Sequence, residues 1–98
     1  MLKRIVSMRF RAGEEERFLE IFASSRGQIR GFAGCQYLEL LRDRHDPQRF
    51  FTISIWQDDA ALQAYRQSRL FADTWAATKA LFAERAQAWS TDSIDLQA

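Results

Sequence analysis

The segment from Phe50 to Phe82 changes its hydrophobic period twice, and this change constrains the fold more than any other feature of the chain. Residues 50–56 alternate β-branched and aromatic side chains at a period of two, which predicts a strand. Asp58 or Asp59 can then cap a helix, and from this point apolar residues recur at helical spacing. The segment therefore predicts one strand followed by two helices. Four of its aromatic side chains are expected to form one wall, namely Trp56, Tyr65, Phe71 and Trp75.

The residues before this segment predict a strand, a helix and a second strand. Residues 2–11 alternate apolar and polar side chains, as in a strand with one face in contact with water. Glutamates at 14–16 favour a helix start, because the helix dipole stabilises negative charge there, and Gly31 is the best candidate for the end of that helix. Residues 34–43 predict a strand, and the turn residues 44–48 join it in a hairpin to the strand that follows.

The complete order of elements predicts an α+β, ferredoxin-like split βαβ fold, in which a four-stranded antiparallel sheet has its helices on one face. Residues 86–95 supply the last strand, whose polar centre suits either an edge of the sheet or pairing outside it. On residues 34–43, Cys35 and Tyr37 are expected on one face and Leu38 and Leu40 on the other, so neither face is purely polar. The face without helices is therefore expected to pack against a second sheet.

The size of the chain predicts a single domain, spanning residues 1–98. A domain of this size buries only about 60–70% of its surface on folding. Because 47% of the residues are apolar, an apolar face larger than one core requires is expected. A second copy of the chain is the partner expected to cover that face, which would make a homodimer.

Charge and hydropathy argue against nucleic-acid and membrane partners. The formal net charge is +1, and the 14 basic and 13 acidic residues are interspersed rather than gathered into a basic stripe. No apolar run approaches the roughly 20 residues that a bilayer-spanning helix needs. With one cysteine and no sequence that resembles a signal peptide, a reducing, cytoplasmic location is the expectation.

Residue types that bind metals occur together at His45, which lies between Asp43 and Asp46. All three lie beside Pro47 in the predicted turn, and exposed turn chemistry explains them, so no metal site is expected. Cys35 has no basic neighbour in the sequence, so we expect a buried, unreactive thiol at this position.

Several short segments spread along the chain resemble the antibiotic biosynthesis monooxygenase family. They are Phe32-Ala33-Gly34-Cys35, Leu38-Glu39-Leu40-Leu41, residues 50–56, Ala61-Leu62 and Tyr65-Arg66. The resemblance covers residues 2–95. It implies a dimeric α+β barrel, in which the sheets of two subunits pack together and the helices lie outside, with a pocket between sheet and helices in each subunit.

The activities known in this family include oxygenation of quinols and anthrone-like aromatics without metal or flavin, oxidative opening of haem, and handling of small aldehydes. Members that degrade haem carry an Asn on the first strand, a Trp on the helix after the third strand and a haem-ligating His one helix later. The corresponding positions in this chain are Ser7, Tyr65 and Trp75. An indole does not ligate iron, so the resemblance favours oxygenation of an electron-rich aromatic molecule without a cofactor.

For such an oxygenase, the resemblance implies an apolar cage with a few polar groups that stabilise a phenolate. The expected catalytic residues are Tyr65, Ser7 and Arg69, and the expected substrate-binding residues are Trp56, Phe71, Trp75, Ser54 and Tyr37. Arg66 is a further candidate, together with Arg69, to hold an anionic substrate.

Each of these residues also has a purely structural explanation, because large aromatic side chains fill cores and a buried tyrosine hydroxyl commonly bonds within the protein. The alternative function is therefore a non-catalytic dimer of the same fold that binds a small apolar ligand or supports a pathway. A relative of the barrel with isomerase, decarboxylase or aldehyde chemistry is a third possibility. An enclosed cavity lined by Tyr65 and at least one of Ser7, Ser54 and Arg69 favours an enzyme, whereas a filled core favours the non-catalytic module.

Overall fold

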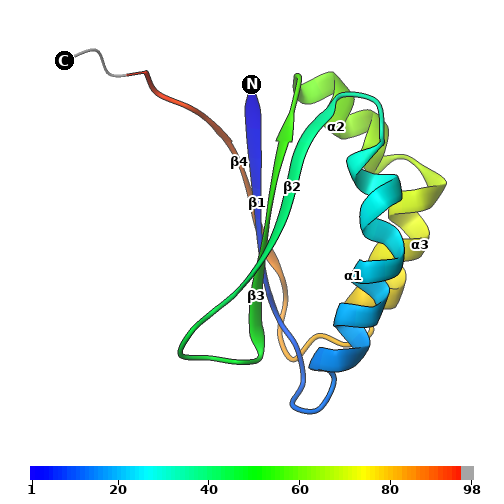
Figure 1. Ribbon diagram of the computed structural model, residues 1–98, viewed down its shortest axis with the longest axis vertical. Helices are drawn as coiled ribbons and strands as arrows, with labels where there is room; N and C mark the ends of the chain where they lie inside the picture. Colours follow the sequence, from blue (N-terminus) through cyan, green and yellow to red (C-terminus); the bar gives the residue numbers. More distant parts are fainter. Residues whose placement is uncertain (96–98) are drawn as a thin grey trace.

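A computed structural model of the chain describes residues 1–95, which form one four-stranded antiparallel sheet with three helices on one of its faces (Figure 1). The elements are β1 (Leu2–Arg9), α1 (Glu15–Arg30), β2 (Cys35–Arg42), β3 (Arg49–Trp56), α2 (Asp59–Arg66), α3 (Arg69–Lys79) and β4 (Gln87–Asp92). The strands lie in the order β2-β3-β1-β4 across the sheet. This arrangement confirms the predicted α+β, ferredoxin-like fold. Among residues 1–95, the helices are too short or too polar to cross a membrane.

Side-chain caps divide residues 59–79 into two helices. The Asp58 carboxylate accepts a hydrogen bond from the N–H of Ala61 at 2.8 Å, at the start of α2. The Ser68 hydroxyl accepts one from the N–H of Phe71 at 3.1 Å, at the start of α3. The predicted pair of helices is confirmed, and of the two candidate aspartates it is Asp58 that caps the first.

β4 forms an edge of the sheet and pairs with β1 in antiparallel register, from Leu2 opposite Asp92 to Ser7 opposite Gln87. All six residues of β4 are exposed. The sequence left open whether this strand lies at an edge or outside the main sheet, and the structure places it at the edge.

The sheet has one face covered by the helices and one face that no element among residues 1–95 covers (Figure 1). Met8 and Phe50 pair across β1 and β3 on the covered face, and both are buried. Ile5 and Ile53 pair with each other on the uncovered face. The apolar character of both faces, predicted from the sequence, is therefore present in the two central strands.

An irregularity in β2 changes which side chains share a face. Cys35 lies opposite Trp56 while Tyr37 lies opposite Ile55, so an extra residue lies between the two positions. Cys35 is consequently buried on the covered face, whereas Tyr37 is on the uncovered face and 41% exposed. The expectation that Cys35 and Tyr37 share a face was wrong, because strict alternation along a strand does not anticipate a bulge.

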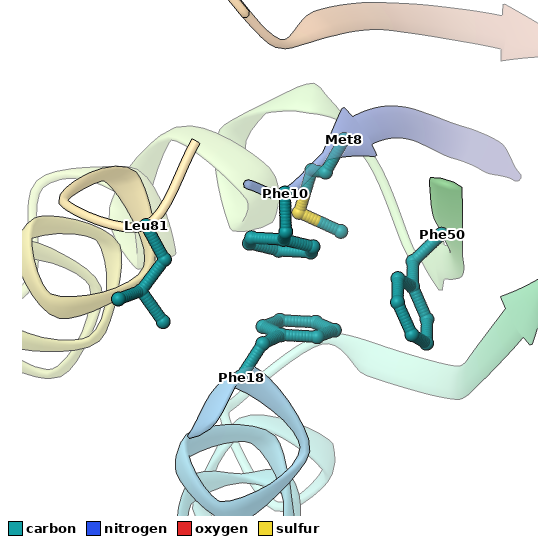
Figure 2. Packing of buried hydrophobic residues seen from close by; sticks show 5 residues of the cluster. All are labelled: Met8, Phe10, Phe18, Phe50 and Leu81. Atoms are coloured by element: carbon teal, nitrogen blue, oxygen red, sulfur yellow. The ribbon is translucent and has the colours of Figure 1, made fainter. Parts of the chain in front are cut away.

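Two hydrophobic clusters occupy the two ends of the covered face. In the first cluster, the rings of Phe10 and Phe18 stack with their centroids 4.2 Å apart (Figure 2). Its buried members are Met8, Phe10, Phe18, Phe50 and Leu81, and those of the second cluster are Cys35, Trp56 and Leu62. Because Phe50 and Trp56 lie near opposite ends of β3, most of the length of that strand separates the two clusters.

Gly34 allows α2 to approach the start of β2 closely. Its φ angle is +87°, and a Cβ at this position would collide with the Cβ of Ala61. We expect Gly34→Ala to lower the free energy of unfolding by about 2–4 kcal/mol, because alanine adds backbone strain and overpacking together.

Gly13→Ala is the matched control, since Gly13 has a φ of +92° but a Cβ there would meet no described atom within 4 Å. We expect it to cost about 1–2 kcal/mol, from strain alone. Urea unfolding of both variants measures the difference, and equal losses would show that the contact with Ala61 is not tight.

Candidate functional site

A cavity of about 270 Å³ lies between the sheet and the helices, and members of both hydrophobic clusters line it. The sheet contributes small or polar side chains at its centre, among them Thr52 and Ser54. The helices contribute the aromatic rings of Tyr65, Phe71 and Trp75. Small-molecule sites typically enclose roughly 300–1,000 Å³, so this cavity lies just below that range and suits a small ligand.

Contacts between aromatic rings form a continuous wall along one side of the cavity. The ring of Trp56 stacks on that of Tyr65 at a centroid distance of 5.0 Å, and Tyr65 meets Phe71 edge to face at 5.3 Å. Phe71 then stacks on Trp75 at 5.8 Å. The structure thus brings together the four residues that the sequence grouped as one wall, and all four line the cavity.

Ser54 is a buried serine on the cavity side of β3. Its Oγ accepts a hydrogen bond from Nε1 of Trp56 at 3.0 Å. This bond satisfies the indole and fixes the orientation of the ring. The hydroxyl hydrogen of Ser54 has no partner among the described residues, so it is available to donate into the cavity.

Tyr65 presents a neutral phenol to the cavity. Burial raises the pKa of Tyr65 to about 12, and the nearby Cys35 thiol adds to the increase. Among residues 1–95, no group forms a hydrogen bond with the Tyr65 hydroxyl, which leaves it free to bind water or a ligand. At neutral pH this side chain is therefore a hydrogen-bond donor and not a base.

Two arginines, Arg4 of β1 and Arg66 of α2, also line the cavity. Burial and the charge of Arg66 lower the pKa of the Arg4 guanidinium, while Asp59 raises it. The sequence suggested Arg66 as an anion-binding residue but missed Arg4. Arginines occur on both faces of the first strand, and alternation alone does not tell which of the two faces meets the helices.

Three of the expected site residues lie outside the cavity lining. Ser7 is on the uncovered face of β1, where its Oγ accepts a hydrogen bond from Nη1 of Arg49 at 2.7 Å. Tyr37 is on the same face because of the bulge in β2. Arg69 has a side chain that is 91% exposed, and its Nε lies 3.5 Å from a carboxylate oxygen of Asp73. None of the three contributes to the cavity that Tyr65 and Ser54 line.

Within the described part of the chain, the polar groups of the lining side chains are hydroxyls, indole N–H groups and guanidinium groups, with no carboxylate, imidazole or thiol among them. Thr78, for example, donates its hydroxyl to the carbonyl oxygen of Thr74 at 2.8 Å. The arrangement can therefore stabilise negative charge on a ligand, but it offers no side chain that accepts a proton near neutral pH.

The turn around His45 is held by the neighbouring aspartates. A carboxylate oxygen of Asp43 accepts hydrogen bonds from the N–H groups of His45 and Asp46, at 2.7 and 3.1 Å. The carboxylate of Asp46 accepts from Nε of Arg9 at 2.9 Å, and this bond lowers the pKa of Asp46. The turn chemistry expected from the sequence thus accounts for the contacts of all three residues.

Comparison with known proteins identifies the class to which this fold and cavity belong. A family model described as antibiotic biosynthesis monooxygenase matches residues 1–77. The chain therefore belongs to the antibiotic biosynthesis monooxygenase family, as its sequence resemblance implied. No curated protein matches the sequence significantly.

Solved structures show the same fold over nearly the whole chain. A crystal structure of an antibiotic biosynthesis monooxygenase is 22% identical, with a TM-score of 0.91 and coverage of 97% of this chain and 100% of the other. PA3566 from Pseudomonas aeruginosa is 26% identical, with a TM-score of 0.85 and coverage of 96% and 94%. Rv0793 from Mycobacterium tuberculosis is 13% identical, with a TM-score of 0.88 and coverage of 99% and 98%. Such similarity supports the fold and leaves the reaction to be argued from the site.

The raised pKa of Tyr65 predicts a specific loss of stability in alkali. An unfolded tyrosine titrates near 10, whereas native Tyr65 keeps its proton until about 12. Between these values the native state binds more protons than the unfolded state, so the free energy of unfolding falls as the pH rises. We expect Tyr65→Phe to lose less stability than the wild type across this window, as measured by urea unfolding.

Absorbance titration of the tyrosinate ion checks the assignment. The transition at the highest pH should disappear in Tyr65→Phe and persist in Tyr37→Phe, which removes the other tyrosine. A Tyr65 that ionises near 10 would contradict the expected desolvation of its phenol.

Proposed function

We propose that the protein is a cofactor-independent oxygenase that acts on an electron-rich aromatic molecule, such as a quinol or an anthrone. The observation that carries this proposal is the composition of the cavity, in which a wall of four aromatic rings faces hydrogen-bond donors and cations. Membership of the antibiotic biosynthesis monooxygenase family supports the same reaction class.

The proposed chemistry begins with deprotonation of the substrate. The hydroxyls of Ser54 and Tyr65 and the guanidinium groups stabilise a phenolate or enolate more than its neutral form, so they lower the pKa of the bound substrate. Because the lining offers no base, the proton leaves to solvent. The resulting anion gives one electron to dioxygen, and the two radicals then combine to form a carbon–oxygen bond.

For anthrone, the balanced reaction converts the CH₂ group to a carbonyl, consumes one O₂ and releases one water. One oxygen atom remains on the carbon, and the other leaves in the water. Trp56, Phe71 and Trp75 would hold the rings of the substrate and exclude water from the radical pair. Ser54 and Tyr65 would act on the oxygen atom of the substrate as hydrogen-bond donors.

Oxygen uptake with anthrone tests this proposal. We expect protein-dependent consumption of O₂ and incorporation of one labelled oxygen atom from ¹⁸O₂ into the product. The double variant Tyr65→Phe, Trp75→Ala should reduce the rate by about 10- to 100-fold, because it removes a donor and part of the aromatic wall.

Two controls accompany the oxygen measurement. Arg26→Gln changes an exposed residue of α1 outside the cavity and should retain the wild-type rate. The O-methyl ether of anthrol, which has no acidic proton, should not react. If the wild type consumed O₂ no faster than the double variant, the proposal that the protein is an oxygenase would be rejected.

A non-catalytic ligand-binding role is the second candidate, and the lack of a proton acceptor among the cavity-lining side chains of residues 1–95 favours it. In that case the cavity binds anthrone without turnover. Calorimetric binding together with no oxygen consumption would support this function over the first.

We also propose that the protein acts as a cytoplasmic homodimer whose uncovered sheet faces pack together. Strand pairing places Ile5 beside Ile53 and Trp89 on this face, and Leu41 beside Phe51. Leu41 and Trp89 are 38% and 46% exposed, which is costly for large apolar side chains in water. The same face on a second copy is a complementary partner, since a two-fold interface pairs each patch with itself.

Sedimentation equilibrium tests the dimer. We expect the wild type to have twice the 11.4 kDa mass of one chain, and Ile53→Lys to sediment as a monomer because it buries a charge at the centre of the interface. Ala72→Lys, on the exposed side of α3, is the matched control and should remain dimeric. A wild-type monomer at micromolar concentration would reject the interface.

A further inference from the structure

Arg4 lies on the floor of the cavity, half-buried, between two serines. Strand pairing places Ser54 of β3 on one side of it and Ser90 of β4 on the other. Its Nη1 donates to Oγ of Ser90 at 2.9 Å, which is a neutral acceptor. A guanidinium has five N–H donors, and this is the single hydrogen bond from the Arg4 side chain to another described residue.

Arg66 brings a second positive charge to the same cavity from α2, directly after Tyr65 in the sequence. Its charge acts unfavourably on Arg4, and the opposing charge of Asp59 lies too far away for an ion pair. Within residues 1–95, neither arginine has a carboxylate within 4.0 Å.

A half-buried charge without a counter-ion, such as that of Arg4, is unfavourable, and the positive charge of the more exposed Arg66 adds to this cost. An anion bound between them would offset both the desolvation of Arg4 and its repulsion by Arg66. A carboxylate suits this position best, because its two oxygens match the paired N–H groups of a guanidinium.

We propose that the ligand of this cavity is an aromatic anion, whose carboxylate binds Arg4 and Arg66 while its rings pack against Tyr65 and Trp56. The proposal rests on the proposed function for the aromatic nature of the ligand, and it narrows the substrate to aromatic acids. It requires binding alone, so it is tested without any turnover.

Isothermal titration calorimetry with two matched probes tests the proposal. 2-Naphthoate and 2-naphthylmethanol share one ring system and nearly one shape, but only the first carries a negative charge at neutral pH. Hydrogen bonds to a charged group contribute about 1.5–3 kcal/mol, so we expect 2-naphthoate to bind roughly 10- to 100-fold more tightly. This preference should weaken as salt is added, while the affinity for the alcohol stays constant.

Substitutions of the arginines locate the source of the preference. Arg66→Gln should reduce the preference for 2-naphthoate several-fold, and Arg4→Gln with Arg66→Gln should abolish it, so that the two probes bind with equal affinity. Arg66→Lys keeps the charge and should retain part of the preference. Arg26→Gln removes one positive charge outside the cavity and should leave the preference at the wild-type value.

Equal affinities of the wild type for the two probes would overturn the proposal, as would a preference that survives the double substitution. Circular dichroism establishes that each variant is folded. If Arg4→Gln fails to fold, Arg66→Gln decides alone, because Arg66 is an exposed residue of α2.

The result of the calorimetric test can be distinguished from the result of the oxygenase test. A naphthoate preference without oxygen uptake would support an anion-binding cavity and reject the enzyme. Oxygen uptake with neutral anthrone, unchanged when both arginines are replaced, would support the enzyme and reject the anionic substrate.

Discussion

The separation of the two hydrophobic clusters is the constraint on which the rest of the structure depends. Phe10, Phe18 and Phe50 pack at one end of the sheet, and Trp56 and Leu62 pack at the other. These large side chains set the distance between sheet and helices along the whole layer. Between them β3 carries Thr52 and Ser54, which are too short to fill the same space. Because the helices are rigid and fixed at both ends, the middle cannot collapse, and a cavity remains.

The polar groups that line this cavity have one electrostatic character. Ser54 accepts a hydrogen bond from Trp56 and keeps its own hydrogen free to donate, burial keeps Tyr65 protonated, and the arginines carry permanent positive charge. Ser54, Tyr65 and the arginines can each donate hydrogen bonds, and they complement negative charge on a bound ligand. The shared fold alone does not determine the reaction, since one fold supports many chemistries. The donor character of the lining is the feature that links this chain to the stabilisation of an anion.

Much of the fold could be predicted from the sequence, because each element has a clear period and clear ends. The change of period after Trp56, the cap at Asp58 and the turn before β3 correspond to the observed elements. The aromatic wall was predictable for the same reason, since strand and helix spacing each place their large rings on one side. The wall is the part of the candidate site on which sequence and structure agree.

The polar part of the site was less predictable, for two physical reasons. On β1, the resemblance favoured Ser7 as a site residue, whereas the charged side chain of this strand that lines the cavity is Arg4, on the opposite face. In β2, the bulge after Cys35 shifts Tyr37 to the uncovered face, and a local insertion of this kind leaves no periodic trace. Arg69 is on the exposed side of α3, beside Asp73, and not on the side that lines the cavity. The functional assignments for these residues came from resemblance, which fixes the fold more firmly than side-chain positions.

The exposed edge strand β4 has a consequence for the wall of the cavity. Its six side chains are all exposed, and it is attached chiefly through its backbone pairing with β1. Yet Ala88 lines the cavity, and Ser90 holds the guanidinium of Arg4. A segment with so little buried surface opens locally at low free-energy cost, well below that of global unfolding. Within one subunit, β4 is therefore the least firmly held part of the cavity wall, and packing of Trp89 against a second copy would restrain it.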